Sequence, residues 1–346
     1  MSRGALLFAA FAAGCSGPAP PAPKPAAPIA QPAPPPVAVP DAPVQVAASR
    51  WHSCARFRSG RVWCWGSNTY GQLGDGSLTV RDTAVRVAGL EDAADIAVGH
   101  EFSCAVRRTG AVACWGRNWW GELGDAAGGV HPAPRAVPGV TGAVQVTAGH
   151  VHACVRRGDG TVWCWGGNQA GQMGRAPDDQ PAAPRQISVD PMGQVAAGAR
   201  YTCGVSTGGR MACWGPEVIW QPEISDAIEV IAAAEEWCVR RRGAELRCER
   251  APWQRTPPPA DLGIAAAGER VMCFARTDGS VECWDGIRAW KPIDGVAAPT
   301  ALAVGFEFAC AIADDLVRCW GRNDQGQLGD GTRAKREKAV TVRMGS

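Results

Sequence analysis

Cysteine is the residue type with the plainest chemistry in this 346-residue chain, which contains fifteen of them. Fourteen fall into seven pairs: Cys54 with Cys64, Cys104 with Cys114, Cys154 with Cys164, Cys203 with Cys213, Cys238 with Cys248, Cys273 with Cys283 and Cys310 with Cys319. The pairs recur after 50, 50, 49, 35, 35 and 37 residues, a period typical of a solenoid, a propeller or an array. Thiols at this spacing can form disulfides in an oxidising compartment, whereas the C-x-x-C spacing of structural zinc sites is absent.

Each cysteine pair fits a β-hairpin. In the first copy we expect strands over 54–57 and 61–65, so that Cys54 faces Cys64; in the seventh copy the turn shrinks to Asp314–Asp315. Directly opposed residues of antiparallel strands lie about 4.5–5.5 Å apart at Cα, within disulfide range. We therefore predict seven disulfides, one in each hairpin. The alternative is fourteen buried free thiols.

A tryptophan follows the second cysteine in six copies, at Trp65, Trp115, Trp165, Trp214, Trp284 and Trp320. The fifth copy has Glu249 there. Strand alternation places this residue on the face opposite the cysteine, which predicts packing between neighbouring repeats. A platform on which sugars stack is the alternative.

The segment Trp65-Gly66…Asn68…Gly71-Gln72-Leu73-Gly74 returns in similar form from Trp115, Trp165 and Trp320. It resembles the repeat of the regulator-of-chromosome-condensation family, whose members fold as seven-bladed β-propellers. The resemblance covers about residues 44–346 and implies an all-β propeller with four-stranded antiparallel blades. Copies four to six lack the Asn…Gly-Gln-Leu-Gly part, so we expect one sector with long loops and one trimmed sector.

The repeats are expected at about 44–92, 93–142, 143–192, 193–227, 228–262, 263–297 and 298–346. The terminal stretch 339–342 matches 84–87. If it forms a strand of the following blade, it docks on the first repeat and closes the ring, which would hide the sheet edges.

Residues 1–15 have the layout of a secretory signal peptide, with a positive start and a short apolar stretch. The end of this segment, Ala12-Ala13-Gly14-Cys15, resembles the lipobox of bacterial lipoproteins, in which the cysteine is lipidated. Residues 16–43 contain twelve prolines and are expected to form an extended tether. The sequence therefore predicts an exported bacterial lipoprotein of the cell envelope, with a lipid anchor as its one membrane contact. The alternative is an ordinary cleaved signal and an incidental cysteine.

The formal net charge is +2 with both signs scattered, which argues against nucleic-acid binding. The chain has no G-x-S-x-G, H-E-x-x-H or Walker-type segment. We therefore predict a protein that is not an enzyme and that has no cofactor and no metal.

Two pairs of histidines recur at repeated positions. His52 and His152 stand where other copies have Phe or Tyr, which predicts packing. His100 and His150 stand four residues before a cysteine, in loops that should converge on one face. A metal held by this second pair and Glu101 is the alternative to a metal-free site.

The positions four and three residues before each first cysteine vary, while their surroundings are monotonous. They are Arg50–Trp51, His100–Glu101, His150–Val151, Ala199–Arg200, Ala234–Glu235, Glu269–Arg270 and Phe306–Glu307. Aromatic and arginine side chains among charges are typical of a protein-binding surface. Our candidate partner-binding residues are the bulky members of this set: Arg50, Trp51, His100, Glu101, His150, Arg200, Glu235, Glu269, Arg270, Phe306 and Glu307. The alternative is an idle rim of solvated side chains.

The favoured function is a monomeric, non-enzymatic binding module that recognises an extracytoplasmic protein or polymer. The chain resembles secreted β-lactamase inhibitor proteins of the propeller type in its repeat and compartment, so enzyme inhibition is one version of this function. A carbohydrate or envelope-polymer binder that uses Trp119 and Trp120 is the alternative. A propeller lyase would need a central acid, base or metal that the sequence does not supply. Nucleotide exchange on a small GTPase, known in the nuclear branch of the family, does not fit an exported protein.

Overall fold

The computed structural model of the chain describes residues 41–125, 128–216, 220–221, 224–243, 246–249, 261–284 and 289–345. The expected signal peptide, the candidate lipidation site Cys15 and residues 16–40 of the expected tether lie outside these residues. Within the described part, no helix has the length and apolarity that crossing a bilayer would take. The carboxylate of Asp41, the first described residue, accepts hydrogen bonds from Ser59 of the first blade.

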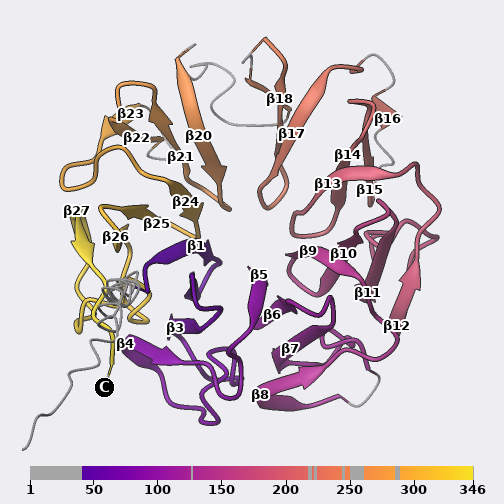
Figure 1. Cartoon of the computed structure of the whole chain (residues 1–346), viewed down its shortest axis with the longest axis horizontal. Helices are drawn as coiled ribbons and strands as arrows, with labels where there is room; N and C mark the ends of the chain where they lie inside the picture. Colours follow the sequence, from indigo (N-terminus) through magenta and orange to yellow (C-terminus); the bar gives the residue numbers. More distant parts are fainter. Residues whose placement is uncertain are drawn as a thin grey trace, which may run out of the picture. The chain divides into compact units, whose positions relative to one another are not determined.

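Seven antiparallel sheets surround a central axis, and each is built from consecutive strands (Figure 1). The first strands line the axis: β1 (Pro43–Ala48), β5 (Ala93–Val98), β9 (Ala143–Ala148), β13 (Met192–Ala197), β17 (Ala227–Ala232), β20 (Leu262–Ala267) and β24 (Ala301–Val304). The second strands are β2 (His52–Phe57), β6 (Phe102–Arg107), β10 (His152–Arg157), β14 (Thr202–Ser206), β18 (Trp237–Arg241), β21 (Met272–Arg276) and β25 (Phe308–Ala313). The third strands are β3 (Val62–Gly66), β7 (Val112–Arg117), β11 (Val162–Asn168), β15 (Met211–Trp214), β19 (Leu246–Glu249), β22 (Val281–Trp284) and β26 (Leu316–Gly321).

The outer strands are β4 (Arg81–Arg86), β8 (Val130–Ala136), β12 (Asp178–Gln186), β16 (Trp220–Gln221), β23 (Trp290–Pro292) and β27 (Arg336–Thr341). Six blades therefore have four strands, and the fifth has three within the described residues. The prediction of an all-β, seven-bladed propeller is confirmed.

One disulfide links the second and third strands of every blade, so the prediction of seven hairpin disulfides is confirmed and the alternative of free thiols is wrong. The bonds join Cys54 to Cys64, Cys104 to Cys114, Cys154 to Cys164, Cys203 to Cys213, Cys238 to Cys248, Cys273 to Cys283 and Cys310 to Cys319. In each pair the Cα atoms lie only 4.0–4.1 Å apart, slightly closer than the expected 4.5–5.5 Å. Seven disulfides are the mark of a chain that folds in an oxidising compartment.

The shortened seventh hairpin keeps the register of the others, with Cys310 opposite Cys319. Its two turn residues, Asp314 and Asp315, have φ values of 53° and 57°. A two-residue hairpin turn of type I′ has positive φ at both central residues, and its backbone twist matches that of the strands it joins. The deletion therefore changes the turn and leaves the disulfide in place.

The tryptophan after the second cysteine packs on the preceding blade, as predicted. Trp65 is fully buried among side chains of the seventh blade, and its indole N–H donates to Gln327 O at 2.8 Å. Trp115 and Trp165 make the same bond to the first and second blades. The fifth blade lacks this tryptophan. There, Trp237 on the neighbouring strand packs against the fourth blade instead.

The first strands of neighbouring blades are linked by side-chain amides. Gln145 donates to Val195 O at 3.0 Å and accepts from Val195 N at 3.2 Å, and Gln194 does the same to Val230. Asp95 holds the equivalent position in the second blade and accepts from Val146 N at 2.7 Å. Burial raises the pKa of Asp95, although the hydrogen bonds that its carboxylate accepts act in the opposite direction. Gln or Asp recurs at this position in the sequence of successive repeats, but its role between blades was not predicted.

The expectation for the C-terminal strand was wrong. β27 pairs with β26 of its own blade rather than with the first blade. All four strands of a blade come from one repeat, so the match between 339–342 and 84–87 reflects two equivalent outer strands. The first blade meets the seventh through packing around Trp65 and through the tail, where Ala84 N donates to Arg343 O and Gly345 N donates to Ala84 O.

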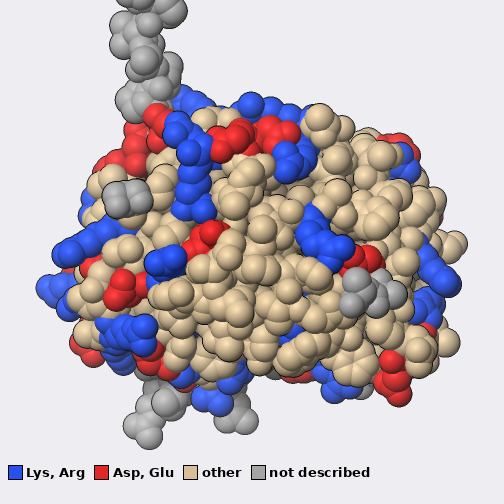
Figure 2. Space-filling view, turned by 90° about the horizontal axis from the view of Figure 1, so that it is seen from below, with Lys and Arg blue, Asp and Glu red and all other residues tan. Residues whose placement is uncertain are grey.

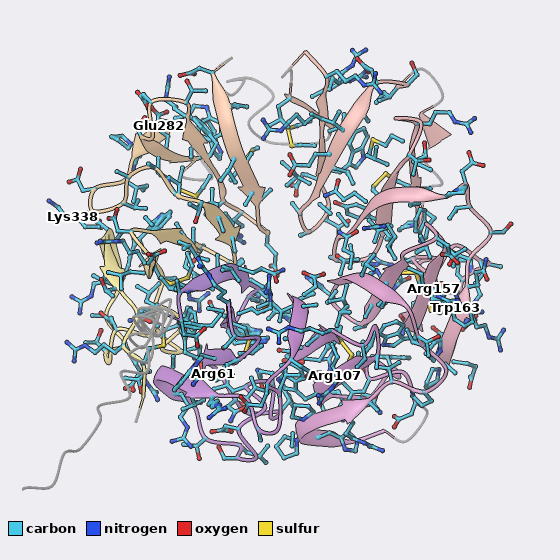
Figure 3. The ribbon with its side chains drawn as sticks, viewed as in Figure 1. Arg61, Arg107, Arg157, Trp163, Glu282 and Lys338 are labelled. Atoms are coloured by element: carbon cyan, nitrogen blue, oxygen red, sulfur yellow. A yellow bond between two sulfur atoms is a disulfide. The ribbon has the colours of Figure 1, made fainter. Side chains whose placement is uncertain are left out.

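The rim carries small groups of both charge signs. On the edge shown in Figure 2, blue and red residues alternate among uncharged ones. Many pair within a blade, as Arg107 does with Asp92 at 2.7 Å. Arg157 and Trp163, labelled in Figure 3, lie together on the third blade, with the guanidinium 5.9 Å from the ring centre. Charged side chains of the rim thus pair with other side chains of the same blade.

Candidate binding face

Seven short connections between first and second strands open onto one end of the propeller; we call them the axial loops. In each, the N–H five residues before the first cysteine donates to the C=O two residues before it, over 2.8–3.1 Å. The two residues between them are the variable pair identified in the sequence. Backbone bonds therefore fix the loop without involving those two side chains.

Residues of all seven axial loops line a cavity of about 90 Å³ at the axis. Gly149 shows why the lining is small: a Cβ there would lie 2.3 Å from Gly198 O of the next blade. Gly305 is equally confined, with Ser49 O only 2.1 Å from such a Cβ. The variable side chains stand around this cavity.

Glu269 of the sixth blade joins side chains across the axis. Its carboxylate pairs with Arg50 of the first blade at 2.6 Å and lies 3.4 Å from His150 Nε2 of the third blade. Burial alone would raise the pKa of Glu269, but the hydrogen bond from His150 and the charge of Arg50 outweigh it and lower the pKa. Glu269 therefore holds a negative charge between blades that do not adjoin its own.

His100 completes this contact on the second blade. Trp51 Nε1–H donates to His100 Nε2 over 3.1 Å, and the ring of His100 stacks on His150 with centroids 4.8 Å apart. Burial lowers the pKa of His100 to about 4, helped by His150, Arg117 and Arg50 and opposed by Glu269. His100 is therefore neutral near pH 7. We name Arg50, Trp51, His100, His150 and Glu269 the axial latch.

Phe306 of the seventh blade lies under three guanidinium groups. Those of Arg50, Arg270 and Arg322 are 4.2, 5.1 and 5.3 Å from the centre of its ring. Phe306 is only 7% exposed, so the predicted aromatic contact is covered by arginines rather than open to a partner. Each arginine over the ring gains a cation–π contact of about 0.5–2 kcal/mol.

Glu307 beside it has φ 60°, in the left-handed region that a glutamate seldom adopts. Its carboxylate lies 3.6 Å from Arg270 and 3.9 Å from Arg322. Arg270 is 66% exposed. These long contacts leave Arg270 available to a second carboxylate.

Glu101 belongs to a buried charge cluster that the sequence did not reveal. Arg117 on β7 pairs with Glu101 and, at 3.0 Å, with Glu122. Glu122 stands where three other copies have Gln, and its other oxygen accepts from Trp120 N at 2.7 Å. Burial raises the pKa of Glu122, and the charge of Arg117 opposes this. The clue in the sequence was the joint appearance of Arg117 and the Gln-to-Glu change.

The remaining predicted residues are not drawn into these clusters. Arg200 and Glu235 are exposed on the fourth and fifth blades. The structure thus brings the candidates of blades one, two, three, six and seven together and leaves blades four and five open.

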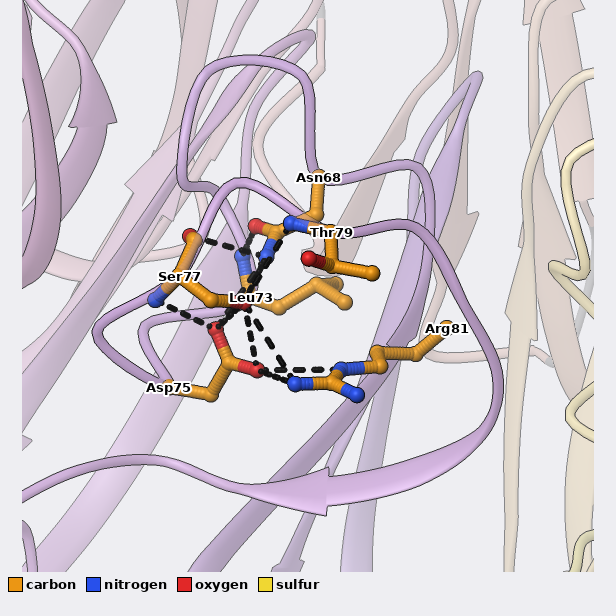
Figure 4. Close-up of polar contacts among 6 residues, drawn as sticks. All are labelled: Asn68, Leu73, Asp75, Ser77, Thr79 and Arg81. Carbon is orange, nitrogen blue, oxygen red and sulfur yellow. Dashed lines mark hydrogen bonds and ion pairs between the residues drawn. The ribbon is translucent and has the colours of Figure 1, made fainter.

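Long loops after the third strands rise on this same end in blades seven, one, two and three. In the first of them, Asn68 accepts from Leu73 N at 3.0 Å and donates to Asp75 (Figure 4). Asp75 also bonds Ser77 and pairs with Arg81 at 2.9 Å. Burial opposes ionisation of Asp75, but these hydrogen bonds lower its pKa. The loop satisfies its own polar groups, so the residues that recur in it build a scaffold.

Trp119 is a large exposed aromatic side chain of these loops, with 51% of its surface accessible. Tyr70 meets it edge-on at 5.2 Å between centroids, and the Arg117 guanidinium lies 5.3 Å from its centroid. Trp120 is partly buried. The glycan alternative therefore depends on Trp119.

His52 and His152 pack in the core, as predicted. Both are fully buried, and burial lowers the pKa of each to about 3. His152 Nε2 bonds Thr202 Oγ1 at 2.9 Å, while its Nδ1 has no partner. Among the described residues, no three His, Cys, Asp or Glu side chains are grouped as a metal site.

Two models of the regulator of chromosome condensation (RCC1) repeat match the sequence, one at residues 44–72 and 143–172 and the other at 59–106 and 159–205. The fold is similar to yeast RCC1 (Prp20), solved in complex with Kap60, with 19% identity, TM-score 0.53, and 87% of this chain and 75% of that chain covered. It is also similar to the CRINKLY WD40 ectodomain of the Arabidopsis thaliana receptor kinase ACR4, with 21% identity, TM-score 0.57, and 81% and 96% covered. Human WBSCR16 follows with 17% identity, TM-score 0.51, and 88% and 83% covered. A comparison with curated protein sequences found no match. Repeat matches in two separate stretches of the chain and seven blades of one design lead to one conclusion: the chain is a seven-bladed β-propeller that contains repeats of the regulator of chromosome condensation type.

Proposed function

We propose that the chain is a non-enzymatic binding protein of the bacterial envelope, which recognises an extracytoplasmic protein through the end of the propeller that carries the axial loops. One observation carries the proposal. Seven loops with the same backbone hydrogen bond present seven different pairs of side chains around one axis. Constant framework with variable, bulky contact residues is the design of a recognition surface.

The two sectors of this end favour a partner with a convex edge. Long loops stand over blades seven, one, two and three, while exposed Arg200, Glu235 and Arg270 lie on the trimmed sector. A partner that binds the trimmed sector from above would also contact the sides of the long loops. Enzyme inhibition is the version in which that edge carries an active site, and the lipid anchor at Cys15 would hold the complex at the membrane.

Capture with matched variants tests the proposal. The full chain is immobilised, exposed to envelope and culture extracts and crosslinked. Arg200→Ala with Arg270→Ala alters the proposed face; Arg58→Ala with Arg242→Ala removes the same charge from exposed turns at the opposite end. We expect a partner that binds the parent and the Arg58/Arg242 variant but loses at least tenfold in affinity for the Arg200/Arg270 variant. Equal capture by both variants would contradict recognition through this face.

The exposure of Trp119 supports a second candidate, in which the same end binds an envelope polysaccharide. An exposed indole can stack on a sugar ring, and Tyr70 meets Trp119 edge-on beside it. Trp119→Ala should then abolish retention on immobilised envelope glycan. Retention that survives this change would remove the candidate.

A further inference from the structure

The axial latch holds side chains from four blades together at the mouth of the central cavity. Arg50 and Trp51 come from the first blade, His100 from the second, His150 from the third and Glu269 from the sixth. The contacts run from Trp51 to His100, from His100 to His150, from His150 to Glu269 and from Glu269 to Arg50. The chain of contacts thus returns to the blade where it started.

One contact in this chain allows only one protonation state. The indole N–H of Trp51 can donate but cannot accept, so His100 Nε2 must carry a lone pair to receive it at 3.1 Å. A protonated His100 has an N–H on both ring nitrogens. The Trp51 contact would then bring two donors face to face.

The groups around His100 mostly repel a positive charge. His150 is stacked on its ring, and Arg50 and Arg117 lie close enough to disfavour the charged form. Buried His52 also interacts unfavourably with a charged His100. Glu269 attracts the charge, but its carboxylate is already paired with Arg50. The low pKa of His100 agrees with this arrangement. A proton on His100 therefore meets a cluster built for the neutral ring.

We propose that acid opens the axial latch: protonation of His100 expels the Trp51 indole N–H, separates the two stacked imidazoles and uncovers the mouth of the cavity. Trp51 is then released toward Arg50 and Arg322, whose guanidinium groups already lie 4.9 and 5.5 Å from its ring centre. The opening itself is independent of any ligand. Its consequence, loss of the bound partner in acid, rests on the proposed function.

NMR of the oxidised full chain, labelled in its histidine and tryptophan side chains, tests the opening directly. Trp51→Phe identifies the Trp51 indole N–H signal. We expect this signal to move with the same midpoint as the His100 ring, near pH 4, while most other indole signals stay in place. In His100→Gln, whose amide accepts a hydrogen bond but does not titrate, the Trp51 signal should stay in its neutral-pH position throughout. His131→Gln, altered on the outer strand β8, should titrate as the parent does.

A charge mimic removes the need for acid. His100→Lys at pH 7.5 should show the Trp51 signal in its acid position and faster hydrogen exchange of the His150 backbone N–H, which bonds Ala199 O at 3.3 Å in the closed state. A Trp51 signal that stays in its neutral-pH position in His100→Lys, or that moves in acid equally in His100→Gln, would overturn the proposal. Because no partner is used, a failed capture experiment leaves this result unaffected, and a closed latch at low pH leaves recognition by the face intact.

Discussion

Replacing His152 with Phe should remove a measurable part of the acid sensitivity of the propeller while leaving its stability near pH 7.5 almost unchanged. His152 is fully buried on β10, and burial lowers its pKa to about 3 from 6.5. Its Nδ1 has no hydrogen-bond partner, so an added proton would leave a buried N–H unsatisfied. The folded state therefore rejects a proton that the unfolded chain accepts.

The sign and size of the effect follow from this difference. Above pH 6.5 neither state binds the proton, and His152 makes no difference to the pH dependence. Between pH 6.5 and pH 4 the unfolded chain alone binds it, over about 2.5 pH units at about 1.4 kcal/mol each. The contribution of His152 to the loss of stability at pH 4 is thus about 3 kcal/mol, and it would level off near pH 3.

Phenylalanine suits the site because the seventh blade already has it there. Phe308 lies against Gly305 as His152 lies against Gly149. The bond from His152 to Thr202 is lost, but the Thr202 hydroxyl still donates to Gln172 O at 3.0 Å. We expect the stability at pH 7.5 to change by no more than about 1 kcal/mol.

Urea unfolding at pH 7.5 and pH 4, with disulfides intact, measures both quantities. His131→Gln serves as the control, because this partly exposed side chain on β8 lies outside the core. The His152→Phe chain should lose about 3 kcal/mol less than the parent between the two pH values. An unchanged loss would mean that His152 is charged in the folded protein, and the argument from burial would be wrong.

Three further changes test other contacts. Trp237→Ser should cost on the order of 3–5 kcal/mol in urea unfolding, and adding Glu249→Trp should recover part of it, because the two positions face each other across the strand pair. Deleting residues 343–345 removes the two backbone bonds to Ala84 and should lower the free energy of unfolding by about 2 kcal/mol, seen as a lower melting temperature in calorimetry. Asp75→Asn should speed hydrogen exchange in the loop at 68–81 at pH 7 with little effect on the free energy of global unfolding. If the free energies of local opening and of global unfolding fell equally, the loop would be shown to support the whole blade.

The fold could be predicted because each copy repeats two local rules. A pair of cysteines that must face each other fixes the hairpin register, and the Trp that follows the second cysteine must point to the other face. The nine-residue spacing of Cys310 and Cys319 follows the first rule as well. The prediction for β27 was wrong because the repeat pattern does not show whether the last strand of a repeat joins its own blade or the next one.

The site was predictable only in part. Spacing from the cysteine showed that His100, His150 and Glu269 belong to loops of one end. It could not show that Glu269 reaches two blades across the axis, because that depends on the radius of the ring and on which side chains are long enough. The role of Trp237 could not be predicted for a similar reason. It depends on the residue opposite it in the strand pair rather than on its position in the repeat.

The contrast between neighbouring positions in the axial loops gives the argument for recognition its physical basis. Gly149 and Gly305, each five residues before a cysteine, are confined because a Cβ there would strike the backbone of the next blade. The next two residues face no such limit, since the loop is held by a backbone bond that spans them. The backbone conformation of the loop therefore does not require particular side chains at these two positions. Their diversity in this chain, with the left-handed backbone at Glu307 and three arginines over Phe306, is therefore not required by the bond that holds the loop. Organised charge and aromatic contacts at positions whose backbone does not depend on them support our proposal that a partner binds at this end.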